Sequence, residues 1–558
     1  MLVNCDSWDW KRGYKQAQSI KFRCYIYNGV RQTHFKNFQK IRDNLSEMTS
    51  RKGIIFVALI FLVFLFLSCQ MPLIRRDNEK QDSSLRDSSD TPVNLVTTEI
   101  SSNFSPARDV TCKYFVAPEG DDNQFGSEQQ PWASFQWAAD KASPGDTICF
   151  RDGVYISDDI HISNSGREDA LITFAAYPGE YPILDGGGSA SELLVLDGGV
   201  AHIRLSGFAL RNYRIWGILL SGKNHHIYLD HLDVEGGEAG IRFTYANSAE
   251  EPPVEGPIEH ILLENSLIHG SQYSAVDCTP GPCNHITLSR LEVFNTGLTG
   301  DAYYGSDGIE FARGHHVLVE DCYVHDNGGD GIDLGSRDRE GHIEGIIVRR
   351  NRVVRNHLNG IKVWAGGRIE NNVIWGSGDS AIWSGSFDCD LELINNTVAY
   401  NMWDPEYSSR NWAVVVGYPE EIPSPEVDLT MVNNIFAFNA DPLEGSPTGV
   451  YLGPGVRLID EATNIFYSNS QEEIMIDAGD GRGFSREDIS NGEWASFSGK
   501  GEGDLINNPM FVSGWPNVDL QLRAFSPAID SGSSNFAPDV DILFLPRAAN
   551  PDIGAYEW

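Results

Sequence analysis

A short phrase of small, apolar and charged residues recurs along the middle of this chain and constrains its fold more than any other feature. A small residue precedes an Ile or Val, and the next residue is usually charged. The small residues at 308, 331, 360 and 381 lie 21 to 29 residues apart, which is the period of a solenoid. The copies are Ala239–Arg242, Ser274–Asp277, Asp307–Glu310, Asp330–Asp333, Asn359–Lys362 and Ser380–Trp383.

A second apolar segment follows each phrase, as in residues 317–324 and 346–353, with apolar residues at its first, third and eighth positions. This pattern predicts a short strand, a polar corner and a further inward side chain. A leucine-rich repeat has a similar period, but the chain lacks its Leu pattern and has no helix-length periodic segment between phrases. We therefore predict an all-β chain wound into a parallel β-helix, with coils about 4.8 Å apart.

Asparagines recur at the corner after the second strand, where Asn tolerates left-handed backbone and stacked amides bond to one another. We expect one ladder of Asn351, Asn371, Asn396 and Asn434 and interpret it as architecture rather than chemistry. The pairs His225–His226 and His315–His316 fall at loop-to-strand junctions, where we expect solvated caps rather than metal ligands.

The first 111 residues have the pattern of an export signal and a linker rather than of a folded domain. Residues 54–67 are an uninterrupted apolar run after two basic residues, too short for the roughly 20 residues that span a bilayer but typical of a signal core. Residues 48–69 would then be the leader, starting at Met48, and residues 1–47 a doubtful extension. Residues 70–111 are polar and read as a flexible linker.

Leu67–Cys69 resembles the lipobox of bacterial lipoproteins. The resemblance implies that Cys69 is lipidated and that the chain is exported to the bacterial cell envelope, at the outer membrane, facing the periplasm or the surface. Its membrane contact would be this lipid anchor alone. The alternative is a membrane anchor with a short basic cytoplasmic tail.

The net charge of −36 argues against nucleic acid as a partner, because phosphate binding needs Lys and Arg. A polyanionic sugar would also be repelled unless a cation intervenes. The cysteines from Cys112 onward match no zinc pattern, and export would permit disulfides such as Cys278 with Cys283, although spacing leaves the pairing open.

Residues 112–558 read as one solenoid domain with covered ends. Residues 131–142 predict a short helix over the first coil. Residues 114–155 resemble the opening, and residues 526–532 and 551–557 the closing segment, of secreted proteins of the pectin-lyase-like superfamily. The resemblance implies a right-handed parallel β-helix with a short N-terminal capping helix, and we expect a monomer.

Glu310, Asp333 and Lys362 hold the same position in three consecutive phrases. We expect them to point outward along one face, with neighbouring Cβ atoms about 4.8 Å apart. Asp307 and Asp330 precede the strands, and a bend at Gly331 would bring the aspartates together. Gathered carboxylates repel one another unless a positive charge lies among them, and a hard cation such as Ca²⁺ fulfils this role. The alternative is a solvated acidic stripe balanced by Lys362, Arg337, Arg339 and Arg368.

Gly329–Leu334 and Asn359–Val363 resemble the active-site segments of family 9 polysaccharide lyases, whose patterns are Asp-Asp-Gly-x-Asp-Leu and Asn-Gly-x-Lys. The first Asp of that pattern is Gly329 here. The resemblance implies a Ca²⁺-dependent lyase that cleaves an acidic, uronate-containing polysaccharide by β-elimination. It assigns Lys362 as the base and Asp330, Asp333 and either Asp307 or Glu310 as Ca²⁺ ligands.

Elimination removes the proton at C5 of a uronic acid, so the base must be neutral, and we expect Ca²⁺ or Arg368 to lower the pKa of Lys362. Basic and aromatic residues beside the column are predicted to bind the sugar chain, although the rings could equally be ladder packing. They are Arg337, Arg368, Trp364 and Tyr304.

Other functions fit the same residues. A β-helix glycoside hydrolase could use Asp277, Glu310 and Asp333 as acid and base, although the chain lacks the Gly-His-Gly and Arg-Ile-Lys motifs of polygalacturonases. A non-catalytic lipoprotein that binds glycan is the third possibility. The sequence leaves open which polysaccharide is cut, and whether epimerisation replaces elimination.

Overall fold

The computed structural model describes residues 110–244, 256–297, 306–335, 343–401, 412–417, 424–439, 449–469 and 473–558. The extension 1–47, the leader 48–69 with Cys69, and the linker up to residue 109 lie outside the described residues. Within the described ranges, no helix is both long and apolar enough to cross a bilayer.

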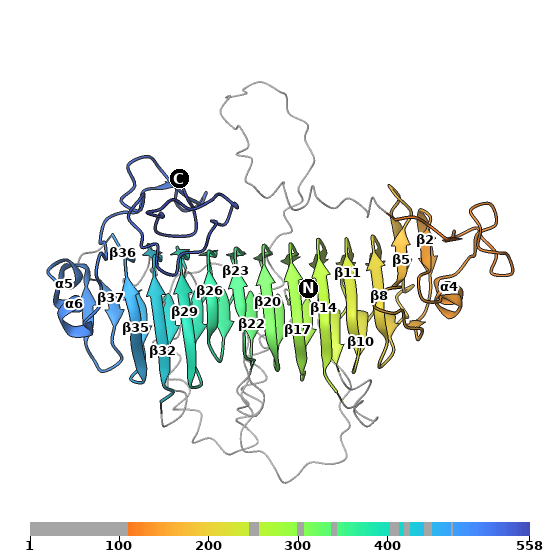
Figure 1. Ribbon diagram of the computed structural model, residues 1–558, viewed down its shortest axis with the longest axis horizontal. Coiled ribbons are helices and arrows are strands. Elements are labelled where there is room, and N and C mark those ends of the chain that lie inside the picture. The colour runs from red at the N-terminus through yellow and green to blue at the C-terminus, as the bar shows by residue number, and fades with distance from the viewer. Residues whose placement is uncertain are drawn as a thin grey trace, which may run out of the picture. The chain divides into compact units, whose positions relative to one another are not determined.

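The described chain coils through three long sheets, and successive strands of each sheet come from successive coils (Figure 1). We call them sheets 1, 2 and 3. Sheet 1 consists, in order, of β1 (Tyr114–Val116), β2 (Thr147–Phe150), β5 (Ile172–Ala176), β8 (Ala201–Ser206), β11 (His225–Asp230), β14 (Ile258–Glu264), β17 (Cys283–Ser289), β20 (Gly314–Glu320), β23 (Ile347–Arg349), β26 (Gly367–Glu370), β29 (Cys389–Ile394), β32 (Val427–Val432) and β35 (Val456–Ala462).

Sheet 2 carries the recurring phrases. Its strands are β4 (Ile160–Ile162), β7 (Glu192–Leu196), β10 (Trp216–Ser221), β13 (Ala239–Thr244), β16 (Val276–Cys278), β19 (Ile309–Phe311), β22 (Ile332–Leu334), β25 (Ile361–Val363), β28 (Ile382–Ser384), β31 (Val414–Val416), β34 (Val450–Leu452), β37 (Ile474–Asp477) and β38 (Gly483–Ser485). All pairs are parallel except β37 with β38.

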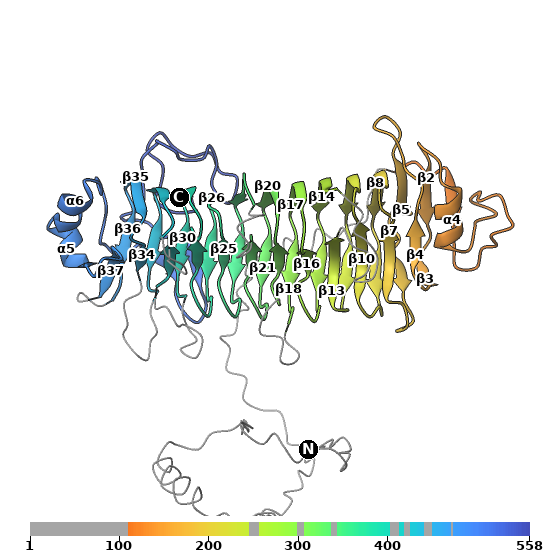
Figure 2. The ribbon, with the colours of Figure 1, turned by 90° about the horizontal axis from the view of Figure 1, so that it is seen from below.

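Sheet 3 closes each coil, and Figure 2 shows its strands beside those of sheet 2. It contains β3 (Gly153–Ile156), β6 (Pro182–Asp185), β9 (Ala209–Arg211), β12 (Asp233–Glu235), β15 (Leu267–His269), β18 (Glu292–Phe294), β21 (Tyr323–His325), β24 (Arg352–Val354), β27 (Val373–Trp375), β30 (Thr397–Ala399), β33 (Ile435–Ala437) and β36 (Ile465–Tyr467). A separate antiparallel pair joins β39 (Phe511–Ser513) and β40 (Asp519–Leu522).

The core is a set of apolar ladders inside the coil. Ile203, Ile227, Ile261 and Ile286 occupy one register position on four neighbouring strands, and each is at most 2 % exposed. Alternation along each strand turns the intervening side chains outward. The parallel β-helix predicted from the phrase period is confirmed.

Helices lie at both ends of the coil (Figure 1). The predicted capping helix is α4 (Phe135–Lys141), and Ser134 caps it by accepting from the Trp137 amide. Its Phe135 is buried and stacks on Phe150 with a centroid distance of 4.5 Å. The other end carries α5 (Arg486–Ser490) and α6 (Glu493–Ser498), which buries Trp494.

The asparagine ladder exists, but the prediction was wrong by one residue in one coil. Asn351, Asn372, Asn396 and Asn434 bond in sequence through their side-chain amides at 3.0 to 3.1 Å. Asn371 instead has a φ of 55° and donates to the Val540 carbonyl, at 2.7 Å, in the C-terminal segment. The left-handed residue thus comes just before the ladder residue, and both positions favour Asn.

Within the described part of the chain, two disulfides join Cys112 with Cys149 and Cys278 with Cys283. The second is the pair suggested by the sequence. Cys322 and Cys389 are free thiols.

Candidate active site

The charged column forms as the phrase spacing predicts. Parallel pairing places Glu310 beside Asp333 and Asp333 beside Lys362 on β19, β22 and β25. The isoleucines that precede them, at 309, 332 and 361, are fully buried in the coil. The three charged side chains therefore lie on the other face of sheet 2.

Lys362 lies between two carboxylates. Its Nζ donates to Asp330 Oδ2 at 2.9 Å and to Asp333 Oδ2 at 2.8 Å. The lysine side chain is 18 % exposed, whereas that of Asp330 is 4 % exposed. The Lys362 side chain is therefore only slightly exposed to solvent, and the two carboxylates that it pairs with are largely buried.

Backbone turns between the strands hold the other two aspartates. The amide of Asp330 donates to Asp307 Oδ1 at 2.6 Å. Asn359 donates twice to Asp330 Oδ1, from its backbone amide at 2.7 Å and its side chain at 2.8 Å. These bonds fix both carboxylates before any ligand binds. Asn359 is not among the site residues predicted from the sequence, although its place in the Asn-Gly-x-Lys segment is a usable signal.

Glycines leave the space that the aspartates fill. A Cβ at position 329 would lie 2.3 Å from Asp307 Oδ1, so an Asp at this position would collide with the Asp307 carboxylate as it lies here. Asp307 thus supplies a carboxylate in the space beside Gly329. At Gly331 a Cβ would lie 2.6 Å from the Asn356 side chain, so close packing explains this glycine.

Three carboxylates and one ammonium leave an excess of negative charge. Burial raises the pKa of Asp307 well above its usual range, and the charges of Asp330 and Asp333 add to the rise. Burial also raises the pKa of Asp333, to about 7, although Lys362 opposes it. Burial lowers the pKa of Lys362, but Asp330 and Asp333 outweigh this effect and raise it overall. The charges of the chain itself therefore keep Lys362 protonated.

The donor set fits a hard cation. Asp307, Asp330 and Asp333 each offer an oxygen within 4.8 Å of the other two, and all three residues are buried. Among the described residues, the buried Asn359 Oδ1 also has no hydrogen-bond partner. Ca²⁺ binds carboxylate and amide oxygens and takes six to eight of them. Water and substrate would have to complete such a set.

Trp364 holds Asp333 rather than presenting a face for a sugar, which corrects the sequence-based expectation. Its Nε1 donates to Asp333 Oδ1 at 2.8 Å, and the residue is only 6 % exposed. Its ring packs edge-on against Trp383 at 4.9 Å and lies 4.8 Å from Lys362 Nζ. Indole and ammonium are thus held together in a cation–π contact.

Arg368 is not brought to this cluster, which corrects a second expectation. It lies on β26 in sheet 1, and its guanidinium pairs with Glu370 and Glu392, each at 2.5 Å. It also donates to the Phe536 carbonyl at 2.9 Å. Arg368 therefore serves sheet 1 and the C-terminal segment and does not act on Lys362. The predicted substrate contacts Arg337 and Tyr304 lie outside the described residues.

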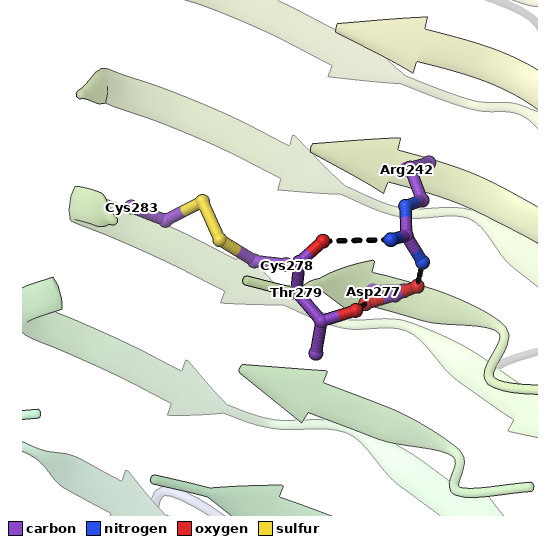
Figure 3. The surroundings of a disulfide bond; sticks show 5 residues. All are labelled: Arg242, Asp277, Cys278, Thr279 and Cys283. Carbon is purple, nitrogen blue, oxygen red and sulfur yellow. Dashed lines mark hydrogen bonds and ion pairs between the residues drawn. A yellow bond between two sulfur atoms is a disulfide. The ribbon is translucent and has the colours of Figure 1, made fainter. Parts of the chain in front are cut away.

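The column continues beyond Glu310 into an ion pair. Asp277, in register with Glu310, pairs with Arg242 and accepts from Thr279 Oγ1 at 2.6 Å (Figure 3). The neighbouring Cys278–Cys283 disulfide ties β16 to β17. Glu310 Oε2 accepts from Ser274 Oγ at 2.6 Å. Asp277 is thus engaged by Arg242 and Thr279, which does not suit the acid of a hydrolase.

A hollow of about 260 Å³ lies elsewhere, over β8, β11 and β14 of sheet 1. None of its lining residues belongs to the column: they are Leu171, Arg204, Tyr228, Leu229, Asp230, Leu262 and Glu264. Arg204 and Asp230 are joined in an ion pair across it. The hollow has no set of reactive groups comparable to the aspartate–lysine cluster.

Comparisons with known proteins agree with this architecture. The family described as "Pel9A-like, right handed beta helix region" matches residues 114–277, and "Right handed beta helix region" matches residues 216–398. The solved pectate lyase Pel9A superposes with a TM-score of 0.50 at 16 % identity, covering 82 % of this chain and 99 % of that one. At this identity the likeness establishes the fold alone.

Two curated relatives were found. Uncharacterized protein YwoF of Bacillus subtilis is 21 % identical over 349 residues, covering 52 % of this chain and 74 % of YwoF. Pectate lyase PEL9 of Emericella nidulans is 40 % identical over 73 residues, covering 13 % of this chain and 18 % of that enzyme. The described chain is therefore a right-handed parallel β-helix, and its residues 114–277 are similar to the Pel9A-like β-helix family.

Proposed function

We propose that this protein is a polysaccharide lyase that cleaves an acidic, uronate-containing polysaccharide by β-elimination, with Lys362 as the base. The observation that carries the proposal is the contact of Lys362 Nζ with Asp330 and Asp333 beside a third buried aspartate. One candidate proton acceptor and one candidate cation site thus adjoin each other on a single face.

We assign Asp307, Asp330 and Asp333 as the groups that would hold Ca²⁺, with Glu310 flanking them on β19, the strand that follows Asp307. A divalent cation held there would supply positive charge where negative charge develops on the substrate carboxylate, and would offset the charges that raise the pKa of Lys362. Asn359 and Trp364 keep two of the carboxylates in place, through bonds to Asp330 and Asp333.

In the proposed reaction, the neutral amine of Lys362, formed by loss of its extra proton to water, takes the proton from C5 of a uronate. The electron pair of the broken C5–H bond forms the C4–C5 double bond. The C4–O bond breaks, and the departing oxygen keeps its electron pair and takes a proton from water. General base catalysis of this kind contributes about 10²- to 10⁴-fold in rate.

A hydrolase is less well supported, because Asp277 is engaged by Arg242 and Thr279. Epimerisation begins with the same proton abstraction but returns a proton to C5 instead of expelling C4–O. From Leu67–Cys69 alone, we propose further that the protein acts at the cell envelope through a lipid anchor. That it is a monomer stays a prediction.

The test is a panel of acidic polysaccharides incubated with the protein, with and without Ca²⁺. Elimination predicts an ultraviolet-absorbing unsaturated product that a chelator abolishes and added Ca²⁺ restores. Reducing ends without ultraviolet absorbance would indicate hydrolysis, and an altered uronate without chain cleavage would indicate epimerisation. Either result would overturn the proposal, and so would activity that resists the chelator.

A further inference from the structure

A ladder of five histidines runs across sheet 1, near the starts of β8, β11, β14, β17 and β20, on a different sheet from the charged column. Each has left-handed backbone with φ between 54° and 59°, and neighbouring rings stack at centroid distances of 4.7 to 4.9 Å. The members are His202, His226, His260, His285 and His316. The rings stack at the spacing of the coils, so packing alone explains this histidine ladder, without a ligand.

Two further histidines are not explained by the ladder. They occupy the register position just before a ladder residue, where the successive coils carry Ala201, His225, Glu259, Asn284 and His315. This position therefore accepts several residue types, and packing does not require an imidazole. At both histidines the ring stands almost perpendicular to the ladder, at 84° to His226 and 87° to His316.

Each extra histidine points a nitrogen at the ladder. His225 Nδ1 lies 2.9 Å from His226 Nδ1, and His315 Nδ1 lies 2.8 Å from His316 Nδ1. In both places the ladder histidine of the preceding coil adds a third nitrogen, and the three ligand atoms lie within 4.8 Å of one another. We call these groups the first triad, His202, His225 and His226, and the second triad, His285, His315 and His316.

We propose that each triad binds one transition-metal ion of the Zn²⁺ type. Two nitrogens on a tetrahedral Zn²⁺, each at about 2.0 to 2.1 Å from the metal, lie about 3.3 Å apart, so the facing Nδ1 atoms need move only slightly. Imidazole suits Zn²⁺, Cu²⁺ and Ni²⁺, whereas Ca²⁺ prefers oxygen. The triads therefore differ chemically from the aspartate cluster.

The surroundings suit a bound cation. The first triad is half-buried and the second is more exposed, so both can be reached from solvent. The charge of Glu168 acts on His202 and His226 and would favour a cation between them. Because each triad draws ligands from two adjacent coils, a bound ion would join β8 to β11 and β17 to β20.

The natural variation along the ladder supplies matched variants. His225→Asn and His315→Asn each copy Asn284 at the same register position, which leaves the stacked column intact. His260→Asn is the control: it removes a stacked ring that belongs to neither triad, and Asn tolerates the left-handed backbone found there.

The experiment measures Zn²⁺ uptake by equilibrium dialysis of full-length protein without a polyhistidine tag. The protein is first stripped with chelator, and excess Ca²⁺ is present to occupy the aspartate cluster. We expect two equivalents of Zn²⁺ in the wild type and in His260→Asn, one in either single triad variant, and none in the double variant. Zn²⁺ should also raise the melting temperature of the wild type but not of the double variant.

Absence of Zn²⁺ uptake by the wild type would overturn the proposal. Wild-type uptake in the double variant would do the same, because the ion would then bind elsewhere. Loss of uptake in His260→Asn equal to that in the double variant would show that stacking, not the triads, governs binding. None of these outcomes depends on catalytic activity, so the test is independent of the proposed lyase function.

Discussion

Lys362 Nζ lies 2.8 Å from Asp333 Oδ2, and the two residues occupy the same register position on adjacent coils. The contact follows from parallel pairing, which places equivalent side chains about 4.8 Å apart. With Asp330 as second partner, the lysine neutralises part of a buried acidic cluster. The residue proposed as base is therefore also a structural counterion.

Replacing Lys362 by Met should destabilise the chelator-treated protein. Removing one partner of a buried ion pair costs about 3 to 5 kcal/mol, and Asp307, Asp330 and Asp333 would be left without the ammonium. Thermal unfolding with and without Ca²⁺ measures the effect. We expect a lower melting temperature with chelator and partial recovery with Ca²⁺. Lys500→Met is the control, because its ammonium contacts only the Ile459 carbonyl among the described residues. Equal shifts in the two variants would contradict the counterion role.

Trp364→Phe should lower activity while keeping the coil folded. The change removes the Nε1 donor that holds Asp333 but retains an aromatic ring. An unsatisfied buried acceptor costs about 1 to 3 kcal/mol. Initial rates and melting temperature should be compared with those of Trp375→Phe, on sheet 3, which should keep wild-type activity. Unimpaired activity in Trp364→Phe would show that Asp333 needs no such support.

Glu461 on β35 and Asp504, which follows α6, form a buried carboxyl pair. From this pair we expect the stability of the fold to fall as the pH rises. Burial raises the pKa of Asp504 from 3.8 to about 6 and raises that of Glu461 well above its usual range. Both groups bind protons more tightly in the folded state than in the unfolded state. Their contribution to stability is therefore present while they are protonated and is lost as they ionise. The free energy of unfolding should therefore decline between about pH 4 and pH 6.

Denaturant unfolding across this range tests the prediction, with Asp504→Asn as the comparison. The Asn side chain does not titrate, so the decline should be shallower in the variant. Subtracting the two curves removes the contribution of the aspartate cluster, since that cluster is unchanged. Parallel curves would rule out the assignment to Asp504.

The two disulfides should differ in their effect on stability. Cys112 and Cys149 are 37 residues apart and Cys278 and Cys283 are 5 apart. By loop entropy the longer link contributes about 4 kcal/mol and the shorter about 2 kcal/mol. Double Ala variants, compared by denaturant midpoint, should show the larger loss for Cys112–Cys149. The reverse order would contradict the loop-entropy account.

The sequence predicts the coil well, because strand alternation and phrase period are both local. It also predicts the order Glu310, Asp333, Lys362, since parallel pairing converts equal phrase positions into neighbours. The asparagine ladder was misplaced by one residue because Asn371 and Asn372 each favour the corner for a different reason. The repeat period alone does not show that Asn371 is the residue with left-handed backbone and Asn372 the residue of the ladder.

The sequence did not indicate which groups the side chains of Arg368 and Trp364 contact. Arg368 follows Lys362 by six residues, yet the turn after β25 carries it to another sheet. Trp364 was expected to meet substrate, but it turns its indole N–H to Asp333. The space beside Gly329, which Asp307 fills, depends on packing between coils. These features can be seen only in the structure, because they are contacts between segments that are far apart in the sequence or lie on different sheets.

The most direct test of the central claim is the rate of unsaturated product formation by Lys362→Ala on a polyuronate that the wild type cleaves in the presence of Ca²⁺. Circular dichroism and Ca²⁺ titration would establish that the variant is folded and holds the ion. The account predicts a loss of at least about 100-fold. A folded, Ca²⁺-bound variant that forms product at the wild-type rate would contradict it.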